Sequence, residues 1–123
     1  MTDAIGDLLD LYYGVLTGGP DAFDDGRSLR RILAPDLDFE GPIAGRATGG
    51  ERFIRGVFGF VETVRHLHLL QRLEAGSEAA TLYDAEMPGG PVRFAEFFTV
   101  AEGRIQSLRL LYDATQYRAR GGR

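Results

Sequence analysis

The chain has 123 residues, of which 44% are hydrophobic and 26% are charged, with a formal net charge of −4 and no cysteine. This size and composition fit one globular domain that can bury a core of its own. The absence of cysteine excludes disulfides and thiolate metal sites, and the acidic balance provides no basic surface for nucleic acid. No apolar run is long enough to span a membrane, and residues 1–16 carry acidic side chains where a signal peptide needs basic ones. We therefore expect a cytoplasmic protein without nucleic-acid or membrane partners.

Two helices are predicted before the first strand. The first, Asp3–Leu16, has apolar residues at helical spacing, with Thr2 as its N-cap and Gly18-Gly19-Pro20 after its end. Tyr12 lies on its buried side and Tyr13 at the margin, and a buried tyrosine hydroxyl needs a hydrogen-bond partner. Residues 21–28 are predicted to form a loop, and residues 29–34 a short helix that ends at a proline.

A short strand, Leu37–Gly41, precedes a glycine-rich loop and a third helix. The sequence Thr48-x-x-Glu51 is typical of a capping box and predicts a helix from about Gly49 to Thr63. The apolar residues of this segment recur at helical spacing and are expected to pack in the core. They are Phe53, Ile54, Val57, Phe58, Val61 and Val64.

Four longer strands follow as a meander. The first two, residues 65–75 and 78–87, are joined at Gly76-Ser77, and the last two lie in residues 91–112 with a tight turn at Ala101-Glu102-Gly103. His66 and His68 share one face of a strand, but no third ligand is evident, so we expect no metal site. Glu96 lies in an otherwise apolar row, and a buried carboxylate is usually paired, protonated or hydrated.

This order of elements predicts an α+β fold. A curved antiparallel sheet wraps around three N-terminal helices to form a cone with an internal pocket. We expect a single domain over residues 1–117, with the Arg/Gly-rich residues 118–123 as a flexible tail.

Two stretches resemble known proteins: LDFEGPIAGRATGGERFIRGV, which is a strand, a Gly-Pro loop and a helix, and the terminal hairpin FAEFFTVAEGRIQSLRLLYD. They are similar to the SnoaL-like and ketosteroid-isomerase-like members of the nuclear transport factor 2-like superfamily. The resemblance covers almost the whole chain and implies the cone-shaped fold. This fold hosts several enzyme activities as well as binding modules, so it does not specify a reaction.

Ketosteroid isomerase uses a carboxylate base together with a tyrosine and a protonated acid that form an oxyanion hole. The resemblance places the tyrosine at Tyr12, with Tyr13 possible, and the protonated acid at Glu96. Tyr12 and Glu96 are the candidate catalytic residues. The base would stand at Gly41, so ketosteroid isomerisation is not expected. Epoxide-hydrolase chemistry is not supported either, because the spacing that needs Arg-x-Asp has Arg93 followed by Ala95.

Two functions remain open: acid–base chemistry of the isomerase, cyclase or dehydratase type on a hydrophobic ring compound, and ligand binding or dimerisation without catalysis. Neither requires a cofactor. We expect a homodimer through the outer sheet face, which carries Arg93, Ala95, Phe97 and Thr99. The candidate substrate-binding residues are the apolar and aromatic ones predicted to face the pocket. They are Phe39, Phe53, Phe58, Tyr83, Phe94, Phe98, Leu110 and Tyr112.

Overall fold

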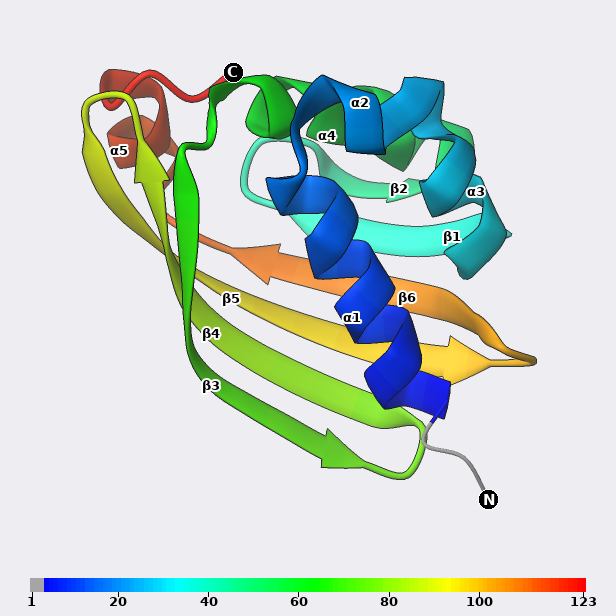
Figure 1. The fold of residues 1–123 in the computed structure, drawn as a ribbon. Coiled ribbons are helices and arrows are strands. Elements are labelled where there is room, and N and C mark those ends of the chain that lie inside the picture. The colour runs from blue at the N-terminus through cyan, green and yellow to red at the C-terminus, as the bar shows by residue number, and fades with distance from the viewer. Residues whose placement is uncertain (1–3) are drawn as a thin grey trace.

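A curved six-stranded sheet carries helices on its concave face, which confirms the predicted α+β class (Figure 1). The computed structural model describes residues 4–123. The strand order across the sheet is β2-β1-β6-β5-β4-β3. In chain order the elements are α1 (Ala4–Thr17), α2 (Gly19–Phe23), η1 (Asp24–Gly26), α3 (Arg27–Ile32), β1 (Leu33–Gly41), β2 (Gly45–Thr48), α4 (Gly50–Thr63), β3 (His66–Ala75), β4 (Glu78–Met87), β5 (Gly90–Ala101), β6 (Arg104–Leu111) and α5 (Ala114–Ala119).

The sheet contains one parallel pair among the described strands, whereas the sequence predicted an antiparallel sheet. Strands β3 to β6 form the expected antiparallel meander. Strand β1 pairs with β6 in parallel, with Leu33 opposite Ile105 and Phe39 opposite Leu108. Parallel pairing needs a long crossover, and here α4 and the four strands β2 to β5 supply it.

The segment before β1 is more regular than predicted. Residues 21–28 were expected to form a loop, but α2 and η1 occupy most of them. Asp24 and Asp25 adopt left-handed backbone angles, with φ of 47° and 55°, so these short helices are separated by sharp turns. The predicted cap of α1, Thr2, lies outside the described residues.

The predicted capping box of α4 does not form. Helix α4 begins after Gly49, and no side chain caps it. Thr48 instead belongs to β2, where it lies opposite Asp38. Glu51 accepts hydrogen bonds from Arg30 at 2.6 and 3.0 Å. The Gly49 N–H donates to the Leu37 carbonyl at 2.7 Å, and this bond holds the start of the helix on the sheet.

The C-terminal residues, expected to be a flexible tail, make specific contacts in the structure. Asp113 caps α5 by accepting a hydrogen bond from the Gln116 N–H at 2.9 Å. The Gly89 N–H donates to the Arg120 carbonyl at 2.9 Å, which ties α5 to the turn between β4 and β5 (Figure 1). The sequence did not reveal α5 because its six residues include one buried side chain, Tyr117.

The convex face of the sheet exposes several large apolar side chains. The register of β3 on β4 shifts between Leu69 and Gln71. No helix in residues 4–123 is long and apolar enough to cross a membrane. The large apolar side chains that line one hollow on this face are Leu73, Phe97 and Leu111.

Candidate functional site

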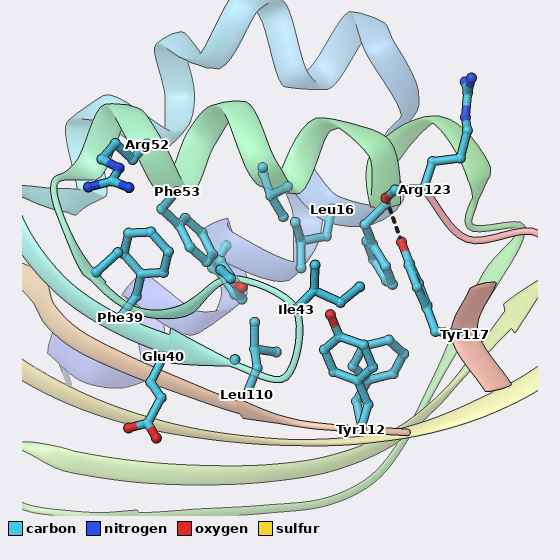
Figure 2. Close-up of a pocket in the computed structure, with 18 of the residues that line it drawn as sticks. Leu16, Phe39, Glu40, Ile43, Arg52, Phe53, Leu110, Tyr112, Tyr117 and Arg123 are labelled. Atoms are coloured by element: carbon cyan, nitrogen blue, oxygen red, sulfur yellow. Dashed lines mark hydrogen bonds between the residues drawn. The ribbon is translucent and has the colours of Figure 1, made fainter. Parts of the chain in front are cut away.

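A cavity of about 360 Å³ lies between helix α4 and the sheet (Figure 2). It is bounded by α1, the β1–β2 hairpin, α4, the strands β4 to β6 and the C-terminal segment. Its walls are mainly apolar and aromatic, which is typical of pockets for small organic molecules. The apolar wall is formed by Leu16, Phe39, Ile43, Ala44, Ala47, Phe53, Val57, Phe60, Phe94 and Leu110.

Behind this wall, three tyrosine hydroxyls surround the carboxylate of Glu96, which is fully buried. Tyr12 donates to Oε2 at 2.8 Å. Tyr13 and Tyr83 both donate to Oε1, each at 2.7 Å. The Tyr13 hydroxyl is also hydrogen bonded to the Thr81 hydroxyl at 2.7 Å. The Glu96 carboxylate thus accepts from three neutral hydroxyls, and no cationic side chain of residues 4–123 is hydrogen bonded to it.

The electrostatics of this cluster follow from its burial. Burial raises the pKa of Glu96 above that of a free glutamate, and the three tyrosine hydrogen bonds offset part of this rise. Burial and the neighbouring Glu96 charge also raise the pKa values of Tyr12 and Tyr83 well above that of a free tyrosine. The tyrosines therefore stay protonated, and Glu96, whose pKa is raised but remains that of a carboxyl group, is the member of the cluster that titrates first as the pH rises.

Glu96 itself does not line the cavity, whereas Tyr12 and Tyr83 do. The carboxylate is therefore separated from any ligand by one layer of tyrosine side chains. This differs from the sequence-based expectation, in which Glu96 meets the substrate directly. While Glu96 accepts from both tyrosines, their hydroxyl protons point toward it and are not available to a ligand.

Most of the predicted binding residues do line the cavity: Phe39, Phe53, Tyr83, Phe94, Leu110 and Tyr112. Phe58 and Phe98 lie outside the lining. The Phe58 ring packs on Phe23 with 4.9 Å between centroids, on the side of α4 away from the cavity. The Phe98 ring is buried against Tyr12 at 5.5 Å.

Both tyrosines that the resemblance offered on the first helix, Tyr12 and its alternative Tyr13, reach Glu96. Sequence reasoning missed two other residues of the site. Tyr117 lines the cavity from α5, a helix that was not predicted. Arg52 lines it from the first turn of α4, where a single exposed arginine gives no signal in the sequence.

The lining offers no carboxylate base that faces inward. Gly41 lies on the wall at the position where the resemblance places the base. The neighbouring Glu40 directs its carboxylate away from the cavity, as Figure 2 shows, and lies 3.8 Å from Arg109. Residues 4–123 also contain no group of three or more histidine or acidic side chains that could hold a metal ion. His68 instead lies 2.9 Å from Glu86.

The chain is similar to solved structures over almost its whole length. A protein from Kribbella flavida shares 27% identity with a TM-score of 0.79, and the match covers 92% of this chain and 89% of that protein. A nuclear transport factor 2-like protein of unknown function from Cytophaga hutchinsonii shares 17% identity with a TM-score of 0.72 and 96% coverage of both chains. A steroid delta-isomerase from Pseudomonas aeruginosa shares 17% identity with a TM-score of 0.76, covering 98% of this chain and 88% of that protein. No protein-family model matches the chain, and no curated protein sequence matches it significantly.

Proposed function

We propose that the chain, whose fold is similar to that of nuclear transport factor 2-like proteins, binds a small hydrophobic ring-type molecule inside its cone. The observation that carries this proposal is the cavity of about 360 Å³ with apolar and aromatic walls. Its volume falls within the range of roughly 300–1,000 Å³ that is usual for ligand pockets. The flat rings of Phe53, Phe94 and Tyr112 on opposite walls favour a planar or near-planar ring system.

Tyr112 supplies a polar anchor for such a ligand. Within the described residues the other tyrosines of the lining are engaged, with Tyr12 and Tyr83 on Glu96 and Tyr117 on the Arg123 carbonyl. The Tyr112 hydroxyl has no hydrogen-bond partner there, and no buried side-chain polar atom is left unsatisfied, so this hydroxyl reaches open space. It can therefore donate to a carbonyl or hydroxyl oxygen of a bound molecule.

A glycine in the wall allows a sharp test of binding. Gly56 lines the cavity from α4, and a Cβ added there would have no neighbouring atom within 4 Å. We expect the longer side chain of Gly56→Leu to extend from this open position into the cavity, and the substitution to favour the helix. We expect the neutral, polarity-sensitive naphthalene dye prodan to bind the wild type with a blue-shifted emission and to lose binding in Gly56→Leu.

The matched control is Gly14→Leu, an exposed glycine on α1 that also has nothing within 4 Å and does not line the cavity. This variant should bind prodan as the wild type does. Absence of saturable prodan binding to the wild type, or equal binding to Gly56→Leu, would refute ligand binding in this cavity.

A second candidate function, acid catalysis, is favoured by the Glu96 cluster. Once protonated, Glu96 donates to one of its tyrosines, and that tyrosine can turn its own proton toward the cavity. Tyr12 would then donate a hydrogen bond to the oxygen of a bound ketone and stabilise the enolate that forms. Water would remove the proton from the α-carbon, since the lining has no inward carboxylate base. In this scheme Tyr12 contacts the substrate and Glu96 is a positioning residue.

Deuterium exchange at the α-carbons of 2-tetralone, a bicyclic ketone, tests this second function by NMR. The wild type should accelerate exchange above the buffer rate, and Tyr12→Phe should abolish the acceleration. Glu96→Gln introduces an amide that donates to a tyrosine at every pH, so it should keep the acceleration and lose its dependence on pH. If 2-tetralone exchanges at the buffer rate in the presence of the wild type, acid catalysis is refuted and ligand binding remains the proposed function.

We also propose that the convex sheet face forms a homodimer contact. Phe97 and Leu111 are 45% and 60% exposed, and they lie on neighbouring strands together with Leu73 on the same surface hollow. Large apolar side chains grouped on one face are typical of an interface between subunits. A second copy would cover them by a two-fold contact, in which the same patch serves both subunits.

A further inference from the structure

Three charged residues line the cavity, and two of them are already neutralised. Glu40 turns away from the cavity toward Arg109. The Arg123 guanidinium lies 3.1 Å from Glu62, and its side chain extends away from the cavity in Figure 2. The third is Arg52, which makes no hydrogen bond or ion pair within residues 4–123. The cavity therefore carries one uncompensated positive charge.

Two carboxylates near Arg52 are already paired with other arginines. Arg30 is paired with Glu51 at 2.6 Å, and Arg46 with Asp38 at 3.2 Å. The carboxylates of Glu51 on α4 and Asp38 on β1 are thus engaged by other arginines. The Arg52 side chain is exposed, so its guanidinium is hydrated and free to receive an anion that arrives with a ligand.

Arg52 also lies at one end of the cavity. In Figure 2 it is drawn on the same side as Phe39, with Tyr117 and Arg123 at the opposite side. A ligand whose ring fills the apolar middle would therefore place a substituent beside Arg52. A carboxylate is costly to bury in apolar walls, but here it would stay at the rim and accept two parallel N–H bonds from the guanidinium.

We propose that the ligand is a ring-type organic acid, with its ring in the cavity and its carboxylate on Arg52. This inference rests on the proposed binding function and narrows it to one chemical class. It also assigns Arg52 as a specificity-determining residue, since a neutral ring compound of the same shape leaves its guanidinium with water alone.

Competition against prodan tests this assignment with two probes of nearly equal shape, 2-naphthoate and 2-naphthamide. The wild type should bind the acid more tightly than the amide, by about fivefold, as befits one partly exposed charge pair. Arg52→Ala should lower the affinity for 2-naphthoate to that for 2-naphthamide, and should leave the affinity for 2-naphthamide unchanged. Raising the salt concentration should shrink the preference of the wild type.

Arg55→Ala is the matched control, because Arg55 is exposed on the same helix and does not line the cavity. It removes the same charge and should keep the preference for the acid. Three results would overturn the assignment of Arg52 and leave the binding function standing. They are equal affinity of the wild type for the two probes, failure of both probes to displace prodan, and a preference for the acid that survives Arg52→Ala. If prodan itself does not bind the wild type, the proposed binding function is refuted before the Arg52 assignment is tested.

Discussion

Tyr13 on α1 and Tyr83 on β4 donate hydrogen bonds to the same oxygen of Glu96, each at 2.7 Å. The helix and the sheet are therefore joined through one carboxylate in the core. A buried carboxylate usually needs a cation or several donors, and here neutral hydroxyls from three positions supply the donors. Such a network stabilises the contact between the layers only while every member keeps its partner.

The stability of the protein should depend on the ionisation of Glu96. Burial raises the pKa of this carboxyl in the folded protein above the unfolded value of about 4.5. The folded state then holds its proton at pH values where the unfolded chain has lost it. The stability contributed by this group is fully present below the unfolded pKa and is lost as the pH rises through the folded pKa.

Glu96→Gln removes this dependence. The free energy of unfolding of the wild type, relative to that of the variant, should fall as the pH rises from the unfolded pKa of about 4.5 through the raised folded pKa. Urea denaturation at intervals across this range measures it, with the exposed Glu78→Gln as control. A difference that stays constant with pH would show that the pKa of Glu96 is not raised.

Removing one donor from the Glu96 cluster should be costly. Tyr13→Phe deletes a hydrogen bond to a buried carboxylate and also leaves Thr81 without this partner, so we expect a loss of about 1–3 kcal/mol in the free energy of unfolding. Tyr112→Phe is the control, since the Tyr112 hydroxyl has no partner in residues 4–123. Denaturant titration should separate the two variants, and equal losses would argue against the cluster.

The N-terminal caps of the last two helices should respond differently to alanine. Asp113→Ala deletes the carboxylate that accepts from the Gln116 N–H, and should cost about 1 kcal/mol. Thr48→Ala should change stability by less than about 0.5 kcal/mol, because Thr48 caps no helix. Thermal or urea unfolding of both variants decides the matter. A larger loss of stability in Thr48→Ala would indicate that the capping box predicted from the sequence does form.

The proposed dimer predicts a specific effect of charge on the convex face. Phe97→Glu should shift the protein toward monomer in sedimentation velocity, because a second copy would bury the new charge against Leu111 or its equivalent. Leu11→Glu is a fair comparison, since Leu11 is 57% exposed but lies on α1, away from that face. If the wild type sediments as a monomer at micromolar concentration, the proposed homodimer is refuted.

The sequence predicted the fold well because its strands alternate and its main helices have clear apolar spacing. The strand Glu78–Met87 and the turn at Ala101-Glu102-Gly103 were both confirmed. The errors fall where local signals compete with tertiary contacts. Thr48 has the residue type of a cap, but pairing with Asp38 places it in a strand.

The candidate site was harder to predict, for a geometric reason. Periodicity tells which side of a strand or helix a residue occupies, but not the depth of a side chain within the core. Glu96 and Phe98 were both predicted to face inward, and they are buried at 0% and 1% exposure, yet neither reaches the cavity. The contact between Tyr12 and Glu96 joins positions 84 residues apart and came from the family resemblance rather than from spacing.

The parallel pairing of β1 with β6 also constrains how the chain folds. Leu33 meets Ile105 across the sheet, so β1 can complete its place only after the meander that ends in β6 has formed. Contacts between such distant positions carry a high loop-closure entropy and form slowly. Until then, β1 has only the short β2 as a partner, and the apolar side of α4 has no sheet to cover. Since the meander pairs only strands that are neighbours in sequence, we expect it to fold first and the cavity wall to close after it.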